Sequence, residues 1–300
     1  MAPIPMNMDD TTRPGLMRAV FRGGALLLAA LPSGVAAKRT DHARADLVAT
    51  IRHDIRQAAP AADDAELAKA LGAVATVPRE SFVPPEYRRY AYASELSLPI
   101  GYDQTISDPY IVALMTASAH VPVGGNVLDV GTGSGYQAAV LGRIAARVTS
   151  VEIVAPLAAQ ATARLAALGY RNVEVRTGDG FTGAPDRAPF DAIIVAAGSD
   201  RVPQPLLDQL KPGGRLVMPV GATWASEQLL VVTRTGAKSY DRCSLGLAMF
   251  VPLTGRGERS LRAAGLIDRS VPLCYGTAVV FPVFVKALPK PDRIKARRTR

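Results

Sequence analysis

The sequence predicts an α/β fold, a doubly wound and mostly parallel sheet of seven strands with helices before it and an antiparallel hairpin at one edge. From Asn126 onward, apolar runs of strand length alternate with helix-like segments. This alternation is typical of parallel strands joined by crossover helices. Such crossovers are right-handed, which gives an open doubly wound sheet. The last two apolar runs have no helix between them, so we expect them to pair antiparallel.

The seven expected strands and their connections follow from the apolar runs and the glycines that separate them. The strands are "NVLDVG" (126–131), "RVTSVEI" (147–153), "NVEVRTGDG" (172–180), "FDAIIVAAG" (190–198), "RLVMPVG" (215–221), "EQLLVVTRTG" (227–236) and "YDRCSLGLAMFVPLTG" (240–255). Helices are expected over 136–146, over 155–170 with Gly169 just after the last turn, and over 203–214 as a short helix with a turn.

The part of the chain before the sheet reads as helices followed by an irregular segment. Two helices are expected over 41–58 and 63–77, with Asp63 as N-cap and Glu66 three residues later, as in a capping box. Residues 77–110 are rich in Pro and Tyr and lack a clear period, which predicts an ordered, irregular segment over the core. Long segments of this kind are usually functional when they are ordered.

The two ends of the chain differ in character from its middle. Arg13, Arg18 and Arg22 precede the short apolar run Gly23–Ala37, a pattern that resembles a secretory signal and is too short to span a bilayer. Residues 289–300 carry six Lys or Arg against one Asp, which explains much of the net charge of +9. We therefore expect a signal-like or disordered extension (1–40), a main domain (41–255) with a helical cap segment (41–110), and a C-terminal extension with a basic tail (256–300).

Composition limits the class of protein. Hydrophobic residues make up 48% of the 300 residues and charged residues 20%, which predicts a packed globular core. The two cysteines, Cys243 and Cys274, lie far apart with no CxxC pattern and no His nearby. A metal site and a disulfide scaffold are therefore poorly supported, although a single bridge stays open if the chain is exported. We expect no metal.

Three glycines on alternate positions follow the first expected strand, in "VLDVGTGSGYQAA". In a doubly wound sheet this strand ends at the crevice where ligands bind. A tight turn there needs glycine backbone conformations, and the helix after it points free N–H groups at the same place. The spacing of Gly131, Gly133 and Gly135 departs from the dinucleotide fingerprint, which places its glycines at G-x-G-x-x-G.

Acidic residues lie at the carboxyl ends of the first three expected strands. Asp129 precedes the glycines, Glu152 ends the second strand, and Asp179 follows the third. Carboxylates would repel a pyrophosphate and suit the positive charges of S-adenosylmethionine. Glu152 is expected to accept hydrogen bonds from the ribose hydroxyl groups, or else to be an exposed strand-end residue. Asp179 is expected to accept a hydrogen bond from the adenine amino group, or else to form an Asp-Gly turn.

Seven segments resemble the protein-L-isoaspartate O-methyltransferase family, a class of Rossmann-like S-adenosylmethionine-dependent methyltransferases. They are "VPRESFVP" (77–84), "LPIGYDQTISDPYIVA" (98–113), "VLDVGTGSGYQAAVL" (127–141), "GDG" (178–180), "PFDAIIVAA" (189–197), "LKPGGRLVMPVG" (210–221) and "FVPLTG" (250–255). The resemblance covers about 43–255. It departs at Gly198-Ser199-Asp200, where the family more often has a proline-containing turn, so that substrate preference is open there.

The resemblance implies methyl transfer from S-adenosylmethionine to the free carboxylate of L-isoaspartyl residues in damaged proteins, which starts their repair. Ser107 matches the family's active-site position; the alternative is that it is the N-cap of the helix that follows, and one residue can fill both roles. The implied substrate contacts are Ile100, Ser107 and Val220. The expected cofactor contacts are Thr105, Ile106, Asp129, Gly131, Thr132, Gly133, Gly135, Tyr136, Gln137, Glu152, Ile153, Asp179 and Gly180.

Two other functions stay open from the sequence: a related methyltransferase acting on an aspartate of a modified peptide, and a non-catalytic module that binds S-adenosylmethionine. We expect isoaspartyl proteins or peptides as partners, no nucleic acid, no stable membrane insertion and a monomer. The cytosolic origin of S-adenosylmethionine favours a cytoplasmic location, and the signal-like segment 13–37 favours export to the periplasm or beyond.

Overall fold

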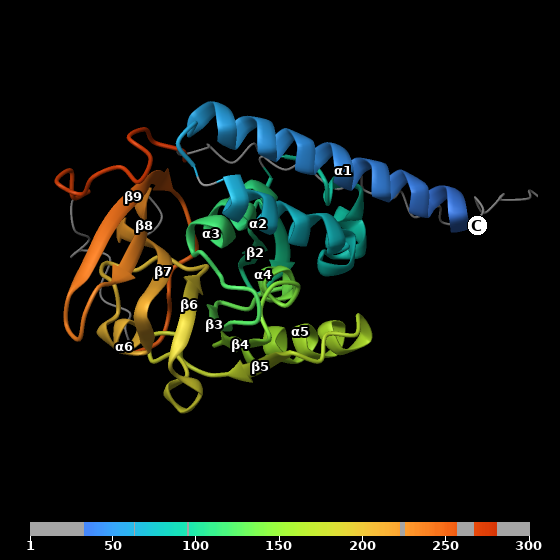
Figure 1. Ribbon diagram of the computed structural model, residues 1–300. Helices are drawn as coiled ribbons and strands as arrows, with labels where there is room; N and C mark the ends of the chain where they lie inside the picture. The colour runs from blue at the N-terminus through green and yellow to red at the C-terminus, as the bar shows by residue number, and fades with distance from the viewer. Residues whose placement is uncertain (1–32, 63, 95, 223–225, 257–266, 281–300) are drawn as a thin grey trace, which may run out of the picture.

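The computed structural model describes residues 33–62, 64–94, 96–222, 226–256 and 267–280. Its centre is the predicted seven-stranded sheet, in the order β5-β4-β3-β6-β7-β8-β9 (Figure 1). The strands are β3 (Asn126–Val130), β4 (Arg147–Glu152), β5 (Val173–Thr177), β6 (Phe190–Val195), β7 (Leu210–Ala222), β8 (Ser226–Arg234) and β9 (Tyr240–Ala248). The five strands β5-β4-β3-β6-β7 pair in parallel, and β8 is antiparallel to both of its neighbours, β7 and β9. The predicted fold class is confirmed.

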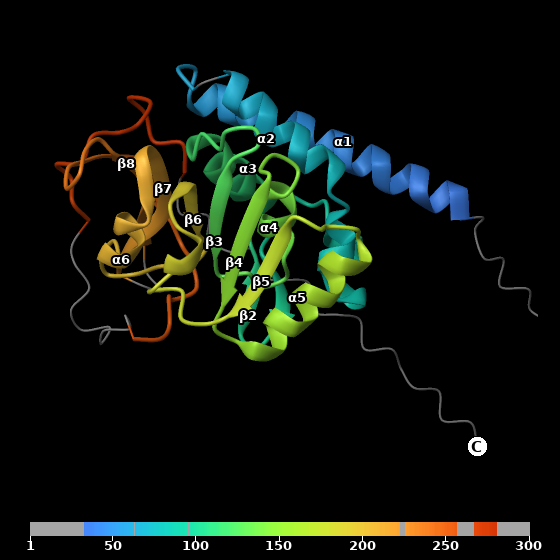
Figure 2. The same ribbon diagram turned by 60° about the horizontal axis from the view of Figure 1, so that its bottom comes forward.

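The sheet separates two apolar cores, because successive side chains of a strand point to opposite faces. Val127 on β3 belongs to one core and the next residue, Leu128, to the other. The helices are α1 (Ser33–Ala58), α2 (Asp64–Thr76), α3 (Pro109–Ser118), α4 (Tyr136–Leu141), α5 (Ala155–Ala167) and α6 (Gln204–Asp208). Helices α1 to α5 contribute to the first core and α6 to the second. Figure 2 shows the parallel strands more nearly face-on.

The helices before the sheet lie as layers on one of its faces. Figure 1 shows α1 along the top of the molecule, with α2 and α3 between it and the sheet. Helix α1 begins before the predicted residue 41, and the predicted N-cap Asp63 lies outside the described residues. In the part of the chain that the structure describes, no helix combines the length and apolar composition that a membrane crossing needs.

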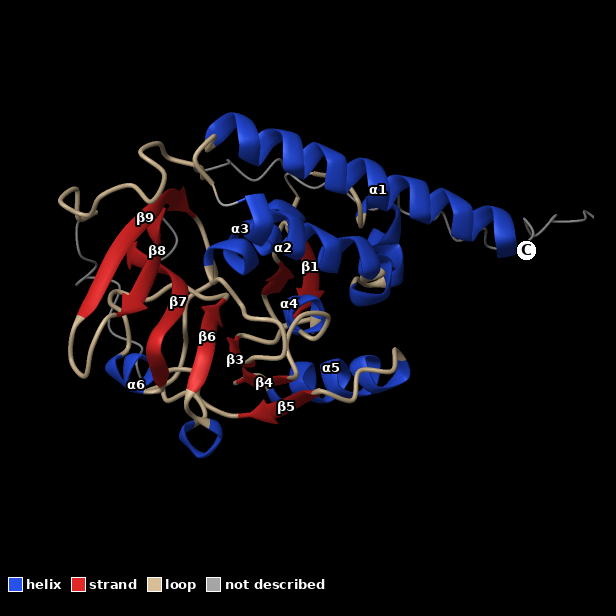
Figure 3. Ribbon diagram, in the orientation of Figure 1, coloured by secondary structure: helices blue, strands red, loops and turns tan. Residues whose placement is uncertain are grey.

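The segment predicted to be irregular contains short regular elements. It holds two 3₁₀ helices, η1 (Arg79–Phe82) and η2 (Pro85–Tyr90), and a hairpin of β1 (Leu98–Gly101) and β2 (Gln104–Ile106) (Figure 3). The hairpin turn places Tyr102 and Asp103 at φ of 54° and 56°. A two-residue turn usually has Asn-Gly or Asp-Gly there, so the Tyr-Asp pair carries no turn signal.

Two expected boundaries on the far side of the sheet are wrong. The short helix expected within 203–214 ends at Asp208, and the "KPGG" expected as a turn belongs to β7. The pairing of β6 with β7 shifts there, from Phe190 opposite Leu210 to Ala192 opposite Arg215, so the extra residues form a bulge. Strand β9 ends at Ala248, before the expected Gly255. The 3₁₀ helix η3 (Pro185–Arg187) precedes β6.

Residues 267–280, here called the C-terminal strap, run along β9 and reach the helical layer. A disulfide joins Cys274 of the strap to Cys243 of β9, with the Cα atoms 4.9 Å apart. The backbone N–H groups of Val279 and Val280 donate to Leu245 on the same strand. At the helical layer, the Tyr110 hydroxyl in the first turn of α3 donates to the Val279 carbonyl at 2.9 Å. The bridge that the sequence left open is therefore present.

Candidate active site

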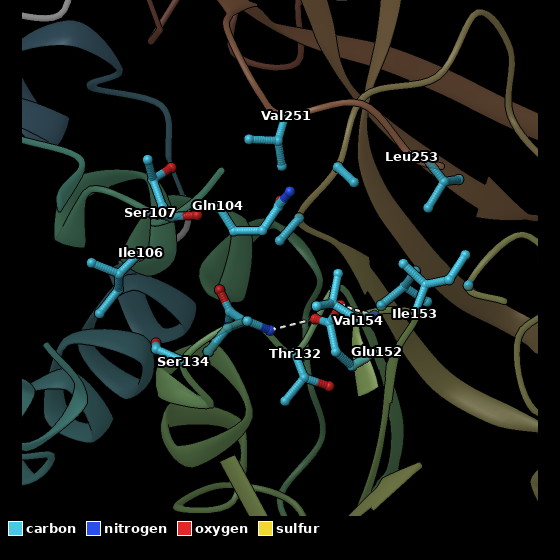
Figure 4. A pocket seen from close by; sticks show the side chains of 18 of the residues that line it. Gln104, Ile106, Ser107, Thr132, Ser134, Glu152, Ile153, Val154, Val251 and Leu253 are labelled. Carbon is cyan, nitrogen blue, oxygen red and sulfur yellow. Dashed lines mark hydrogen bonds between the residues drawn. The ribbon is translucent and has the colours of Figure 1, made fainter. Parts of the chain in front are cut away.

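A cavity opens at the carboxyl ends of β3 and β4, where a doubly wound sheet binds its ligands (Figure 4). Its volume is about 770 Å³ when the open mouth is included. One wall is residues 104–107, which are strand β2 and the first residue after it, and the floor is the glycine loop with the end of β4. The opposite wall is residues 251–254, which follow β9.

The glycine loop, residues 131–135, has the backbone that its sequence predicts. Gly131, Gly133 and Gly135 have φ of 88°, 50° and 89°, all in the left-handed region that other residues avoid. A side chain at Gly133 would also approach Ile100 of β1, at 3.2 Å from its Cδ1. Gly135 precedes α4 directly, so the first N–H groups of that helix lie beside the loop.

Glu152 at the end of β4 lines the cavity and shapes its floor. Its Oε2 accepts a hydrogen bond from the Gly133 N–H at 2.7 Å, and its Oε1 accepts one from the Val154 N–H at 2.9 Å. Because each carboxylate oxygen has two lone pairs, both keep acceptor capacity for a ligand. Figure 4 shows Glu152 beside Thr132 and Ile153 on this floor. The alternative of an exposed strand-end residue is wrong, since Glu152 is 5% exposed.

Replacing Glu152 with glutamine is expected to weaken binding of S-adenosylhomocysteine about 10- to 100-fold, because a charged hydrogen-bond acceptor is lost. Titration calorimetry measures this change. The matched control is Glu174→Gln on β5, whose carboxylate contacts Arg176 and Arg187 away from the cavity. Equal affinities of the two variants would contradict a ligand-binding role for Glu152.

Asp129 lies beneath the floor and is not among the residues that line the cavity. It is completely buried, and its Oδ2 accepts a hydrogen bond from the Ser150 hydroxyl at 2.6 Å. The Ser150 hydroxyl lies 2.5 Å from that of Thr132, which does line the cavity. Oδ1 of Asp129 has no hydrogen-bond partner among the described residues. Two hydroxyl groups therefore link Asp129 to a residue that lines the cavity.

Burial raises the pKa of Asp129 to about 7, the Ser150 hydrogen bond opposes the rise, and the charge of Glu152 adds to it. Because the pKa of Asp129 is higher in the folded chain than its unfolded value near 3.8, its contribution to folding stability is fully present below pH 3.8. This contribution is lost as the pH rises through about 7. Without ligand, the free energy of unfolding of Asp129→Asn, taken relative to that of the wild type, is therefore expected to rise by about 2 kcal/mol from pH 5 to pH 8.5. Urea unfolding at both pH values measures this.

The wild type and the variant are compared at each pH because a second buried acid titrates in the same range. Burial also raises the pKa of Glu227 to about 7, and Glu227 is present in both proteins. Its contribution cancels in the difference. An identical dependence of unfolding free energy on pH in the variant and the wild type would show that Asp129 keeps an ordinary pKa in the fold.

Asp179 lies at the turn after β5, and its carboxylate contacts residues 255–256, which follow the cavity wall at 251–254. Its Oδ1 accepts from the Phe181 N–H at 2.9 Å, and its Oδ2 accepts from the Arg256 N–H at 2.8 Å. A Cβ at Gly255 would lie within 2.8 Å of this carboxylate. Gly180 lines the cavity and Asp179 does not, so the expected contact with adenine stays a prediction.

Ser107 lines the wall between the hairpin and α3. The helix N-cap is the next residue, Asp108, whose side chain accepts from the Tyr110 N–H at 2.7 Å. The alternative that Ser107 is the N-cap is therefore wrong. Figure 4 shows Ser107 across the cavity from Glu152, with Gln104 near it.

The cavity contains most, though not all, of the residues expected from the sequence. Those that line it are Thr105, Ile106, Ser107, Gly131, Thr132, Gly133, Tyr136, Gln137, Glu152, Ile153 and Gly180. Asp129, Gly135 and Asp179 lie next to lining residues without lining it themselves. Of the expected substrate contacts, Ile100 lies against Gly133, and Val220 pairs with Ser199 beyond β6.

The sequence did not predict a site role for the far wall, residues 251–254. This wall is held by the connection after β6, because Gly198 donates to Val251 at 2.8 Å and accepts from Leu253 at 2.7 Å. Beneath it lies Glu227 of β8, fully buried, with Oε2 accepting from the Phe250 N–H at 3.1 Å. Its Oε1 lies 2.4 Å from where a Cβ of Gly198 would sit.

Comparison with known proteins identifies the family. A model of the family described as Protein-L-isoaspartate(D-aspartate) O-methyltransferase (PCMT) matches residues 59–258 of the chain. The chain belongs to this family. Its PCMT region contains the glycine loop, Ser107, Glu152 and the far wall, and the resemblance drawn from the seven sequence segments is confirmed.

Curated PCMT relatives are similar over most of their own length. The protein-L-isoaspartate O-methyltransferase of Gloeobacter violaceus is 52% identical over 184 residues, which is 61% of this chain and 89% of the relative. Protein-L-isoaspartate O-methyltransferase 2 of Syntrophobacter fumaroxidans is 46% identical over 242 residues, covering 80% of this chain and 94% of the relative.

Solved PCMT structures share the fold. One protein-L-isoaspartate O-methyltransferase is 26% identical with a TM-score of 0.62, covering 71% of this chain and 67% of that one. A structure from Plasmodium falciparum, in complex with S-adenosyl-L-homocysteine, is 21% identical with a TM-score of 0.57. It covers 70% of this chain and 98% of its own, a likeness of fold.

Proposed function

We propose that the chain transfers a methyl group from S-adenosylmethionine to the free carboxylate of L-isoaspartyl residues in damaged proteins or peptides, which initiates their repair. The observation that carries this proposal is the cavity, in which Ser107 faces the glycine loop and Glu152. Membership of the PCMT family supports the same activity.

The cavity residues fit S-adenosylmethionine. The left-handed glycines leave a cradle without side chains, and Glu152 supplies acceptors at its floor. The Glu152 carboxylate gives the floor a negative charge, which suits the positive charges of the cofactor, and buried Asp129 lies beneath it. Thr105, Ile106, Tyr136, Gln137, Ile153 and Gly180 complete the proposed contacts.

The chemistry needs positioning more than proton transfer. When bound, S-adenosylmethionine supplies an electrophilic methyl group on a sulfonium. The isoaspartyl carboxylate is already ionised at neutral pH, so no general base is required. Ser107 donates a hydrogen bond to this carboxylate and fixes its direction of attack. The far wall at 251–254 covers the opposite side and reduces access of water.

The test is transfer of radiolabelled methyl groups to a synthetic isoaspartyl peptide and to its normal aspartyl twin. We expect base-labile label on the isoaspartyl peptide alone. Label on the aspartyl peptide alone would support a methyltransferase for modified peptides instead. Calorimetric binding of S-adenosylhomocysteine with no transfer to either peptide would indicate a binding module without turnover.

The disulfide bears on where the chain acts. Disulfides persist in oxidising compartments and are rare in the cytosol, so Cys243–Cys274 favours the exported alternative over the cytoplasmic one. We therefore propose an oxidising compartment for the mature protein. Sequencing its N-terminus and labelling free thiols in intact cells test this, and two reactive thiols with an uncleaved N-terminus would favour the cytoplasm.

We also propose that the enzyme acts as a monomer on protein substrates and not on nucleic acid. Light scattering of the purified chain tests the first point. Methyl transfer to RNA or DNA under the conditions of the peptide assay tests the second.

A further inference from the structure

Arg79, the first residue of η1, is an unusual buried cation. Its side chain is 1% exposed, and none of its three guanidinium nitrogen atoms has a hydrogen-bond partner within the described residues. A buried guanidinium group without hydrogen bonds costs free energy, so a chain under selection for stability alone would replace it with an apolar side chain. This cost calls for a functional reason.

The surroundings of Arg79 connect it to both halves of the site. Its Cζ lies 4.7 Å from the centroid of the Tyr136 ring, and Phe82 of the same 3₁₀ helix packs edge-on against that ring at 5.6 Å. Burial lowers the pKa of Arg79, and the nearby Tyr136 and Asp108 oppose this effect. Tyr136 begins α4 and lines the cavity, and Asp108 follows Ser107.

We propose that Arg79 is a positioning residue that holds the Ser107–Asp108 turn at a fixed place relative to Tyr136 and the glycine loop. Its guanidinium carbon lies 4.7 Å over the Tyr136 ring while its charge attracts Asp108. In-line transfer requires the substrate carboxylate, set by Ser107, to meet the methyl group, set by the glycine loop. Arg79 lies behind the cavity and touches neither reactant.

This inference rests on the proposed function, and it separates binding from transfer. Arg79 contacts Tyr136 among the proposed cofactor contacts, whereas Glu152 and the glycine loop do not involve it, so binding of S-adenosylhomocysteine is expected to change little. The relative placement of the two reactants does depend on Arg79, so kcat is expected to fall. A role in packing alone would instead lower stability and leave the kcat of folded molecules unchanged.

The experiment compares Arg79→Met with wild type for peptide methylation, S-adenosylhomocysteine binding and urea unfolding. We expect kcat to fall about 10-fold or more with the dissociation constant changed less than about 3-fold. Stability should be equal or higher, because a buried guanidinium group without hydrogen bonds is removed. The matched control is Arg143→Met, since exposed Arg143 lies 4.7 Å over the Tyr170 ring and neither residue lines the cavity.

A wild-type kcat in Arg79→Met, or an equal loss in Arg143→Met, would overturn the inference. If Arg79→Met fails to fold, Arg79→Lys decides, because lysine keeps the charge but not the planar face. Reduced kcat with retained binding in Arg79→Lys supports the proposal, and wild-type kcat contradicts it. Failure of the wild type itself to methylate the isoaspartyl peptide would count against the proposed function.

Discussion

Replacing Ser107 with alanine is expected to lower kcat/KM for an isoaspartyl peptide about 100-fold, because the carboxylate loses the hydrogen bond that directs its attack. The structure leaves the Ser107 hydroxyl available for this role, since Asp108 caps α3. Affinity for S-adenosylhomocysteine should stay close to wild type, because the cofactor cradle lies on the floor of the cavity. Radiolabelled methyl transfer and calorimetry measure the two effects.

The control for Ser107→Ala lies at the other end of the same helix. Ser118 is buried, with its hydroxyl 3.5 Å from that of Tyr275 in the C-terminal strap. Ser118→Ala removes the same hydroxyl group without touching the cavity, so its kcat/KM should match wild type. If both variants lose activity equally, the loss reflects a disturbed α3 and Ser107 has no specific role.

Reducing the Cys243–Cys274 disulfide is expected to lower the free energy of unfolding by about 3–4 kcal/mol, because the bridge closes a long loop in the unfolded chain. Without the bridge, the strap also loses its covalent attachment to β9. The strap carries the Val279 carbonyl that accepts from Tyr110 in the first turn of α3. Urea unfolding of the wild type with and without a phosphine reductant measures the loss.

A double variant, Cys243→Ser with Cys274→Ser, separates the bridge from other effects of the reductant. Its stability should equal that of the reduced wild type and should not respond to reductant. If wild-type stability is the same in both conditions, the bridge does not contribute to the fold in solution.

The sequence predicted the sheet and the floor of the site because both depend on local patterns. A buried strand followed by alternating glycines determines where β3 ends and what backbone follows, and all three φ values agree with that. Glu152 could be placed because carboxyl ends of neighbouring parallel strands meet at one edge. The hairpin turn at Tyr102 and Asp103 had no such local signal.

The features that the sequence missed depend on contacts between distant segments. The far wall enters the site because Pro252 pairs with Gly198 across the sheet edge, which no periodicity reveals. Asp129 precedes the glycines as predicted, but its side chain lies beneath the floor. The hydroxyl groups of Ser150 and Thr132 lie between it and the cavity. Arg79 lies in the segment "VPRESFVP" (77–84), and only its burial against Tyr136 distinguishes it from a surface arginine.

The close approach of Glu227 to Gly198 couples what each position can hold. A Cβ at position 198 would lie 2.4 Å from the Oε1 atom of Glu227 and 3.0 Å from its Cδ atom. A side chain can therefore be accommodated at position 198 only if the carboxyl group beneath it moves or is replaced by a shorter group.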